Sequence, residues 1–171
     1  MILFHNKVFL DTFFIAFTWL GSLYFLTPSA LILTGFLLWA GKSREILLLV
    51  LSLSTAGIAV HIAKLIFRRP RPDSLVHLVP MPTDWSFPSG HTAQATAFFL
   101  SVTLIAIRTL PPALATLTAV FSLLIVIGVG YSRVYLQVHY LSDVLAGMAL
   151  AVLLVLVVDA LLPNNYVHIG K

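Results

Sequence analysis

Long apolar stretches separated by short polar segments make up most of this chain. A helix needs about 20 consecutive apolar residues to cross a bilayer, and in hydrocarbon only a helix satisfies its backbone polar groups within one segment. We therefore predict an all-α membrane protein, a bundle of about five to six transmembrane helices. The apolar stretches run from Val8 to Ala40, Ile46 to about Phe67, Thr92 to Ile107, about Ala113 to Val129, and Leu141 to Leu162.

The first apolar stretch is too long for a single crossing. Gly21-Ser22 and Thr27-Pro28 interrupt it, and proline favours the first turn of a helix over its interior, so we predict two helices there. The leading helix carries Asp11 and other polar residues, which suits an interfacial helix or a short re-entrant segment. Ser29 to Ala40 would form the core of a crossing. The alternative is six crossings, with Val8 to Tyr24 as a short first span.

The composition is that of an integral membrane protein. Hydrophobic residues make up 60% of the chain and charged residues 9%, with a mean hydropathy of +1.02, far outside the range of soluble domains. The helices leave no room for a soluble domain, so we expect residues 1–171 to form a single integral membrane domain. The absence of cysteine excludes disulfides and a thiolate nucleophile. Near the N-terminus His5, Lys7 and Asp11 interrupt the apolar run, and no small-residue cleavage site follows, which argues against a removable signal peptide.

The charge pattern indicates contact with phosphate in a membrane setting. The net charge is only +4, and the basic residues gather in loops instead of forming a stripe with interleaved aromatics, so nucleic-acid binding is not expected. Lipid headgroups or a phosphorylated substrate are the partners that basic loops at a membrane meet. We expect the bilayer and a membrane lipid phosphate as partners, and infer no obligatory protein partner.

The basic loops also predict an orientation. Lys42, Arg44 and Arg108 fall on one side by the parity of the crossings, and the positive-inside rule makes that side cytoplasmic, with Lys171 there as well. The opposite loops carry as many cations, which we assign to ligand binding. The compact chain looks prokaryotic, so we expect a bacterial inner (cytoplasmic) membrane protein whose active site faces the periplasm or exterior. The cations of the opposite loops are Arg68, Arg69, Arg71 and Arg133.

Three short polar blocks hold most of the chemistry of the chain. Charged side chains at membrane depth cost free energy and persist mainly where they serve a function. A transferring phosphoryl group spreads charge over three oxygens, so catalysis relies on positioning and on fixed positive potential. Lysine supplies a point charge and arginine a planar fork for two oxygens. The blocks are Lys64 to Arg71-Pro72, Pro88-Ser89-Gly90-His91, and Ser132-Arg133 followed by His139 and Asp143.

The second block is expected to begin a helix. Ser89 is a plausible N-cap of a helix starting near Thr92, and the amides of Gly90 and His91 would then point outward from its positive end. Glycine allows the backbone to approach an anion closely. We therefore predict that this turn adds to the phosphate site.

The third block predicts a nucleophile. His139 and Asp143 are four residues apart, so on a helix they share one face, and the carboxylate can accept the imidazole Nδ1 proton. The Nε2 atom is then free to attack phosphorus, and the carboxylate stabilises the positive ring of a phosphohistidine. His91 would protonate the leaving oxygen and later activate water.

All three blocks resemble the signature motifs of the type 2 phosphatidic acid phosphatase family, the membrane lipid phosphate phosphatases. The match covers Lys64-x6-Arg71-Pro72, Pro88-Ser89-Gly90-His91 and Ser132-Arg133-x5-His139-x3-Asp143, in order and without substitution. The resemblance implies a lipid phosphatase with His139 as nucleophile, Asp143 as its partner and His91 as acid/base. It assigns phosphate binding to Lys64, Arg71, Ser89, Gly90 and Arg133.

Other chemistries fit less well. A metal site would need clustered His, Cys or carboxylates, whereas the chain has six acidic residues, of which only Asp143 is expected near the site, so we expect neither metal nor cofactor. A transporter would carry its charges at mid-span. Vanadate-dependent haloperoxidases of the same fold family are soluble. A phosphotransferase that passes the phosphate of a lipid diphosphate to an acceptor other than water stays open.

Several polar residues also have a simple structural reading. Arg68 and Arg69 could end a span and meet lipid phosphates. His61 is more often a packed polar residue than a ligand. Asp143 could cap the helix that follows, and Asp159 near the last helix end is expected to be merely interfacial.

The substrate is expected to be an amphiphile whose phosphate lies at headgroup depth. Candidates are phosphatidylglycerophosphate, undecaprenyl diphosphate, phosphatidate and the phosphates of lipid A. The loop from Asp73 to Phe87 is short and mostly uncharged, which favours small headgroups or diphosphates.

Overall fold

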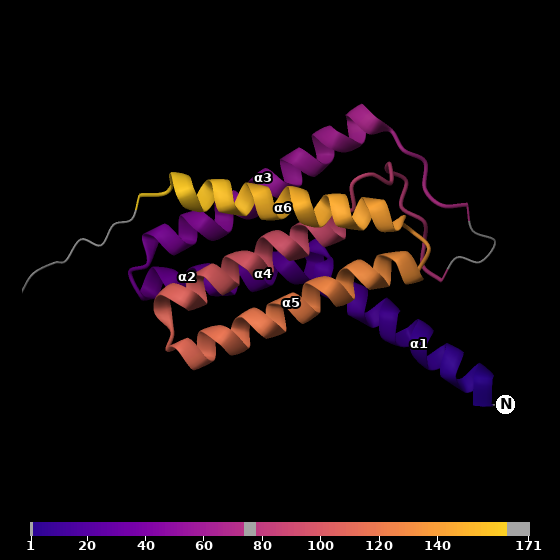
Figure 1. The fold of residues 1–171 in the computed structure, drawn as a ribbon, viewed down its shortest axis with the longest axis horizontal. Helices are drawn as coiled ribbons and strands as arrows, with labels where there is room; N and C mark the ends of the chain where they lie inside the picture. Colours follow the sequence, from indigo (N-terminus) through magenta and orange to yellow (C-terminus); the bar gives the residue numbers. More distant parts are fainter. Residues whose placement is uncertain (1, 74–77, 164–171) are drawn as a thin grey trace, which may run out of the picture.

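The computed structural model is a bundle of α-helices, and it describes residues 2–73 and 78–163 (Figure 1). No strand occurs in these two ranges, which confirms the predicted all-α class. The elements are α1 (Ile2–Thr18), the 3-10 turn η1 (Trp19–Gly21), α2 (Leu23–Trp39), α3 (Ser43–Phe67), α4 (Gly90–Thr109), α5 (Pro112–Tyr135) and α6 (Leu141–Leu161).

Four helices, α3 to α6, are long and apolar enough to cross a membrane. The α1 segment from Lys7 and α2 pass the same test only together, and they are bent by 46° at the break between them. Counted as one broken span, the pair brings the number of candidate crossings in the described chain to five. Such a bent pair fits the expectation of a leading re-entrant or interfacial segment.

The break in the first apolar stretch lies at Gly21-Ser22, as predicted, but Pro28 lies inside α2 and does not start a helix. Packing against the rest of the bundle accounts for the position of the break. A Cβ atom on Gly21 would lie 2.5 Å from Val129 Cγ1 and 3.1 Å from the carbonyl oxygen of His91. Only glycine allows the chain to turn this close to α4 and α5.

Helix α4 lies at the centre of the bundle. It packs against α3, α5 and α6, and Figure 1 shows it running between the last two. In its most apolar window 56% of the residues are buried, against 28% in each of the other three spans. Small side chains allow this central position, because they let neighbouring helices approach. The buried alanines of α4 are Ala93, Ala95, Ala97 and Ala106.

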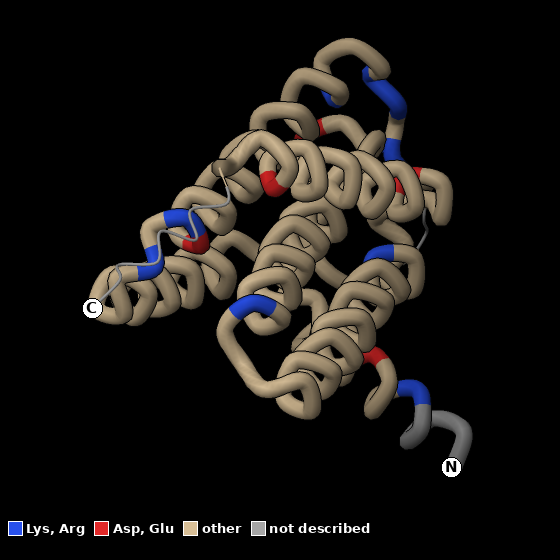
Figure 2. Tube along the Cα trace, turned by 60° about the vertical axis from the view of Figure 1, so that its left-hand side comes forward, with Lys and Arg blue, Asp and Glu red and all other residues tan. Residues whose placement is uncertain are grey.

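The charged residues gather at the two ends of the bundle (Figure 2). At one end Asp159, expected to be merely interfacial, joins three helices. Its Oδ1 atom forms an ion pair with Arg44 Nη2 at 3.1 Å, its backbone carbonyl accepts from the same nitrogen at 3.0 Å, and both carboxylate oxygens accept from Arg108 Nη2 at 2.6 Å. The predicted placement of Arg44 and Arg108 on one side is therefore confirmed. Lys171, expected on the same side, lies outside the described residues.

Candidate active site

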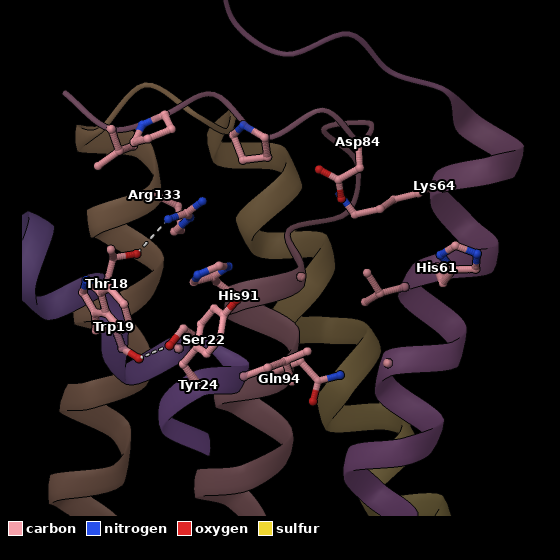
Figure 3. Close-up of a pocket in the computed structure, with 18 residues that line it drawn as sticks. Thr18, Trp19, Ser22, Tyr24, His61, Lys64, Asp84, His91, Gln94 and Arg133 are labelled. Atoms are coloured by element: carbon pink, nitrogen blue, oxygen red, sulfur yellow. Dashed lines mark hydrogen bonds and ion pairs between the residues drawn. The ribbon is translucent and has the colours of Figure 1, made fainter. Parts of the chain in front are cut away.

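The three polar blocks meet at the opposite end of the bundle, although they are far apart in sequence. Lys64 is in the last turn of α3, and the loop that follows (residues 68–89, the α3–α4 loop) carries Arg71. Gly90 and His91 begin α4, and Arg133 is in the last turn of α5. These elements line an open pocket of about 600 Å³ (Figure 3). Lys64, Gly90, His91 and Arg133 are among its lining residues, whereas Arg71, His139 and Asp143 are not.

His139 and Asp143 form a buried pair. The Nδ1 atom of His139 lies 3.4 Å from Oδ2 of Asp143, and both side chains are almost fully excluded from solvent. The expected sharing of one helix face is wrong in detail, because His139 precedes α6 and the contact spans the helix start. Asp143 Oδ2 also accepts from the backbone N–H of Tyr140 at 3.0 Å. Asp143 therefore caps the helix and holds the imidazole at the same time.

The protonation state of His139 suits a nucleophile. Burial, together with the charges of Arg133, Arg71 and Lys64, lowers its pKa to about 4, although the hydrogen bond with Asp143 acts to raise it. The ring is therefore neutral near pH 7. With its Nδ1 proton directed at Asp143, the lone pair is on Nε2, which lies 3.3 Å from Nη1 of Arg71. In this structure Nε2 therefore accepts a long hydrogen bond from Arg71, a cation that can hold a phosphate.

Arg69, which the sequence places only among the cations of the ligand-binding loops, contacts Asp143 directly. Its Nη1 atom donates to Asp143 Oδ1 at 2.8 Å and to Ser142 Oγ at 2.7 Å, and its guanidinium stacks 4.0 Å above the ring of Tyr140. The alternative that Arg69 ends a span and meets lipid phosphates stays a prediction. Asp143 is fully buried, so its carboxylate needs a partner, and Arg69 is one.

Ser86 is the second partner of Asp143 that the sequence did not indicate. This fully buried hydroxyl donates to Asp143 Oδ2, and the Ser86 N–H donates to the carbonyl of Arg69 at 2.9 Å. These contacts join the beginning of the α3–α4 loop, at Arg69, to its end, at Ser86, beside the carboxylate of Asp143. A single serine before the Pro-Ser-Gly-His block gave no pattern that would have marked it.

Lys64 and Arg71 share one acidic partner, Asp84 of the α3–α4 loop. Lys64 Nζ lies 2.9 Å from Asp84 Oδ2, and Arg71 Nη2 lies 2.5 Å from Asp84 Oδ1. Carbonyl oxygens hold the two cations as well, that of Trp85 for Lys64 and that of Val138, at 2.7 Å, for Arg71. The expectation that only Asp143 among the acidic residues lies near the site is wrong, because the loop folds back over α3.

The charge of Asp84 is maintained by these partners. Burial raises the pKa of its carboxyl, but the hydrogen bonds from Lys64 and Arg71 and their charges outweigh this effect and bring it below its usual value. Asp84 is therefore ionised near pH 7. Asp84 therefore partly neutralises Lys64 and Arg71 in this structure, and the two cations do not form an open patch of positive charge.

Arg133 is buried and points at the pocket from α5 (Figure 3). Its Nη1 atom donates to Thr18 Oγ1, at the end of α1, at 2.8 Å. Its buried Nε atom has no hydrogen-bond partner. The end of α1 therefore holds in place an arginine that lines the pocket.

The start of α4 is close to the prediction. Ser89 is at the N-cap position and the helix begins at Gly90, slightly earlier than expected. The Ser89 side chain does not cap the helix; its buried Oγ lies 2.9 Å from Thr92 Oγ1, which satisfies it instead. The Ser89 N–H donates to the carbonyl of Asp143 at 3.0 Å, which ties the helix start to the His139–Asp143 pair. Gly90 and His91 line the pocket, whereas Ser89 does not.

The rest of the pocket is largely apolar. Helices α2, α3 and α4, the η1 turn and the α3–α4 loop provide its walls. Figure 3 shows two further polar groups, His61 across from Arg133 and His91, and Gln94 on the same helix as His91. His61, expected to be a packed residue, is thus a wall residue. The apolar lining residues include Trp19, Leu23, Tyr24, Val60, Val79 and Pro80. In the part of the chain that the structure describes, no three His, Asp or Glu side chains come together as a metal site.

Known proteins with similar sequences are phosphatases. The family model of the PAP2 superfamily matches residues 45–166. Phosphatidylglycerophosphatase B of Bacillus subtilis (strain 168) is 33% identical over 141 residues, which are 80% of this chain and 68% of that protein. An undecaprenyl-diphosphatase of Sulfolobus acidocaldarius is 32% identical over 122 residues, 68% of this chain, and this chain covers only 55% of that protein's length.

Solved structures show the same architecture. The crystal structure of a transmembrane PAP2-type phosphatidylglycerolphosphate phosphatase from Bacillus subtilis matches with a TM-score of 0.80 and 31% identity, over 89% of this chain and 76% of that one. The crystal structure of Aquifex aeolicus LpxE matches with a TM-score of 0.69 and 28% identity, over 88% of this chain and 85% of that one. The chain therefore belongs to the PAP2 superfamily, and it is an integral membrane protein with the activity of a lipid phosphatase.

Proposed function

We propose that the protein hydrolyses a phosphate monoester or diphosphate of a membrane lipid without a metal ion, through a phosphohistidine on His139. The observation that carries this proposal is the division of labour between the two nitrogens of the ring. Nδ1 faces the carboxylate of Asp143, and Nε2 lies 3.3 Å from Arg71 Nη1. A phosphate bound to Arg71 would therefore meet the lone pair of the imidazole.

The first half of the reaction forms the phosphoenzyme. Lys64, Arg71 and Arg133, with the N–H groups at the start of α4, hold the phosphate oxygens and stabilise the charge of the transition state. Nε2 of His139 attacks phosphorus, the bond to the leaving oxygen breaks, and His91 donates a proton to that oxygen. Asp143 balances the positive charge that the ring of His139 acquires.

The second half returns the enzyme to its starting state. His91, now neutral, accepts a proton from a water molecule that attacks phosphorus, and the bond from phosphorus to Nε2 of His139 breaks. Inorganic phosphate is released, and His91 carries the proton for the next cycle. Its position in the pocket wall, on the first turn of α4, supports this role.

The preferred substrates follow from the pocket and from the relatives. The names of the relatives make phosphatidylglycerophosphate and undecaprenyl diphosphate the first choices, with phosphatidate and lipid A phosphates as further candidates. The part of the α3–α4 loop from Asp73 to Phe87 is short and mostly uncharged, which favours a small headgroup or a diphosphate. The apolar walls would contact the lipid next to its phosphate.

We place the enzyme in the inner membrane of a bacterium, with the phosphate site at the periplasmic or exterior face. The cluster of Arg44 and Arg108 at the other end of the bundle supports this orientation, because basic residues prefer the cytoplasmic side.

A panel of lipids tests the proposal. The purified protein in detergent, with EDTA present, should release inorganic phosphate from at least one of the four candidates. His139→Ala should abolish release, whereas His5→Ala, which lies outside the three polar blocks, should retain it. Equal activity in the two variants would exclude His139 as the nucleophile. No phosphate release from any lipid of the panel would contradict the proposed phosphatase reaction.

A further inference from the structure

Asp84 contacts two of the residues proposed to bind phosphate, Lys64 and Arg71. Its two carboxylate oxygens each bind one of the cations assigned to phosphate, at 2.9 Å for Lys64 and 2.5 Å for Arg71. A carboxylate in this position presents to the cations what two phosphate oxygens would present. The labelled side chains of Figure 3 show Asp84 next to Lys64 at the mouth of the same pocket that His91 and Arg133 line.

The two sides of this contact differ in exposure. The side chains of Lys64 and Arg71 are only 9% exposed, and the carbonyls of Trp85 and Val138 accept from them in addition to the carboxylate. The side chain of Asp84 is 54% exposed. The backbone therefore holds the cations in place, whereas the carboxylate has room to turn into water when another anion replaces it at the cations.

We propose that Asp84 is an internal competitor for the phosphate site and sets its affinity. This inference rests on the proposed function, because it assumes that Lys64 and Arg71 bind the phosphate. Every phosphate ligand must displace the carboxylate, so its affinity is reduced by the free energy of the Asp84 contacts.

The consequence differs for substrate and product. A lipid phosphate keeps the contacts of its hydrocarbon with the pocket walls and with the bilayer, whereas inorganic phosphate has no other contact. Asp84 reduces the affinity for both ligands by the same factor. The substrate still binds through its hydrocarbon, whereas inorganic phosphate is released. When phosphate leaves, the carboxylate returns to the two cations, which spares them an unpaired state near the membrane.

The alternative is that Asp84 positions the cations for the phosphate. In that case the carboxylate would stay in place beside the anion, and its removal would misplace Lys64 and Arg71. The two roles predict opposite changes in phosphate affinity when the carboxylate is removed. Loss of the carboxylate strengthens phosphate binding if Asp84 competes and weakens it if Asp84 positions.

The test is calorimetric titration of inorganic phosphate into the purified, detergent-solubilised protein at fixed ionic strength. Asp84→Asn removes the negative charge and keeps the shape of the side chain, whereas Asp84→Ala removes the whole polar group. Both variants retain the backbone carbonyl of residue 84, which accepts from Arg71 Nε at 3.0 Å. The matched control is Asp73→Asn, which removes one negative charge from an exposed position in the same loop. Asp73 has no ion pair among the described residues.

Both Asp84 variants should bind phosphate about tenfold more tightly than wild type, because a charge-assisted contact is lost, discounted for its exposure. Asp73→Asn should change the affinity by about twofold at most, the effect of net charge alone. Unchanged or weaker binding in both Asp84 variants, with normal binding in wild type, would overturn the competitor role and leave the phosphatase intact. If phosphate bound to none of the four proteins, the phosphate site itself would be wrong, and with it the proposed function.

Discussion

Replacing Asp143 with asparagine perturbs the most connected side chain of the site. The carboxylate accepts from Arg69 at Oδ1 and from Ser86, the Tyr140 N–H and His139 at Oδ2. Asparagine has one accepting oxygen, so one of the two positions becomes an N–H group that faces a donor. A buried donor left without an acceptor costs about 1–3 kcal/mol. For a chain of this size that corresponds to a decrease in Tm of roughly 2–10 °C.

Asp143→Asn should also lower kcat, and by more than the loss of stability explains. If the amide faces His139, the ring must accept at Nδ1, its proton moves to Nε2, and no lone pair is left for attack on phosphorus. The corresponding exchange in a Ser-His-Asp triad lowers kcat by about 10⁴. Since Nδ1 and Oδ2 are 3.4 Å apart, at the long end of a hydrogen bond, we expect a decrease in kcat between about 10² and 10⁴.

A double-mutant cycle with Arg69→Met separates the two effects. If the new amide faces the guanidinium, removing Arg69 relieves the repulsion, so Arg69→Met should lower Tm less in Asp143→Asn than in wild type. Thermal unfolding in detergent and initial rates of phosphate release on the best lipid of the panel supply both quantities. An Asp143→Asn enzyme within about tenfold of wild-type kcat would refute the role given to Asp143.

Three further predictions concern pH, packing and the leading helix. Because the pKa of His139 is about 4 in the folded protein against 6.5 ordinarily, the folded state binds fewer protons between these values. Its stability should therefore fall, by up to about 3 kcal/mol, as the pH is lowered through that range, and His139→Gln should lose part of that dependence in thermal melts. Gly147→Ala would place a Cβ atom 2.7 Å from the carbonyl that precedes α4, so it should lower Tm and phosphate release together, whereas Gly35→Ala, with nothing within 4 Å, should leave both near wild type. Thr18→Val removes the hydroxyl that holds Arg133 and should raise KM severalfold with a smaller change in kcat, whereas an unchanged KM would show that this anchor is dispensable.

The sequence predicted the helices because a bilayer imposes length and composition on each crossing. It located α3 to α6 and the break at Gly21-Ser22. It placed a helix start at Pro28 wrongly, since the break lies at Gly21, whose close packing depends on His91 of α4 and Val129 of α5, both far away in the chain. Local rules for proline and glycine contain no such information.

The site was predictable where spacing carried the signal. Histidine and aspartate four residues apart, and basic residues at fixed separations, indicated which side chains would meet. Arg69, Ser86 and Asp84 were not predictable, because their roles arise from the path of the α3–α4 loop and no local spacing sets them. In retrospect, the one signal for Asp84 was the excess of cations: buried lysine and arginine at a membrane face need a carboxylate in the absence of substrate.

The phosphoenzyme is the most direct measurement of the mechanism. A lipid substrate labelled with ³²P on the scissile phosphate is mixed with the enzyme, quenched in denaturant at alkaline pH, and the label is located by peptide mapping. We expect an acid-labile label on the peptide that contains His139 and none in His139→Ala. Label on any other residue, or label that persists in His139→Ala, would contradict the proposed nucleophile.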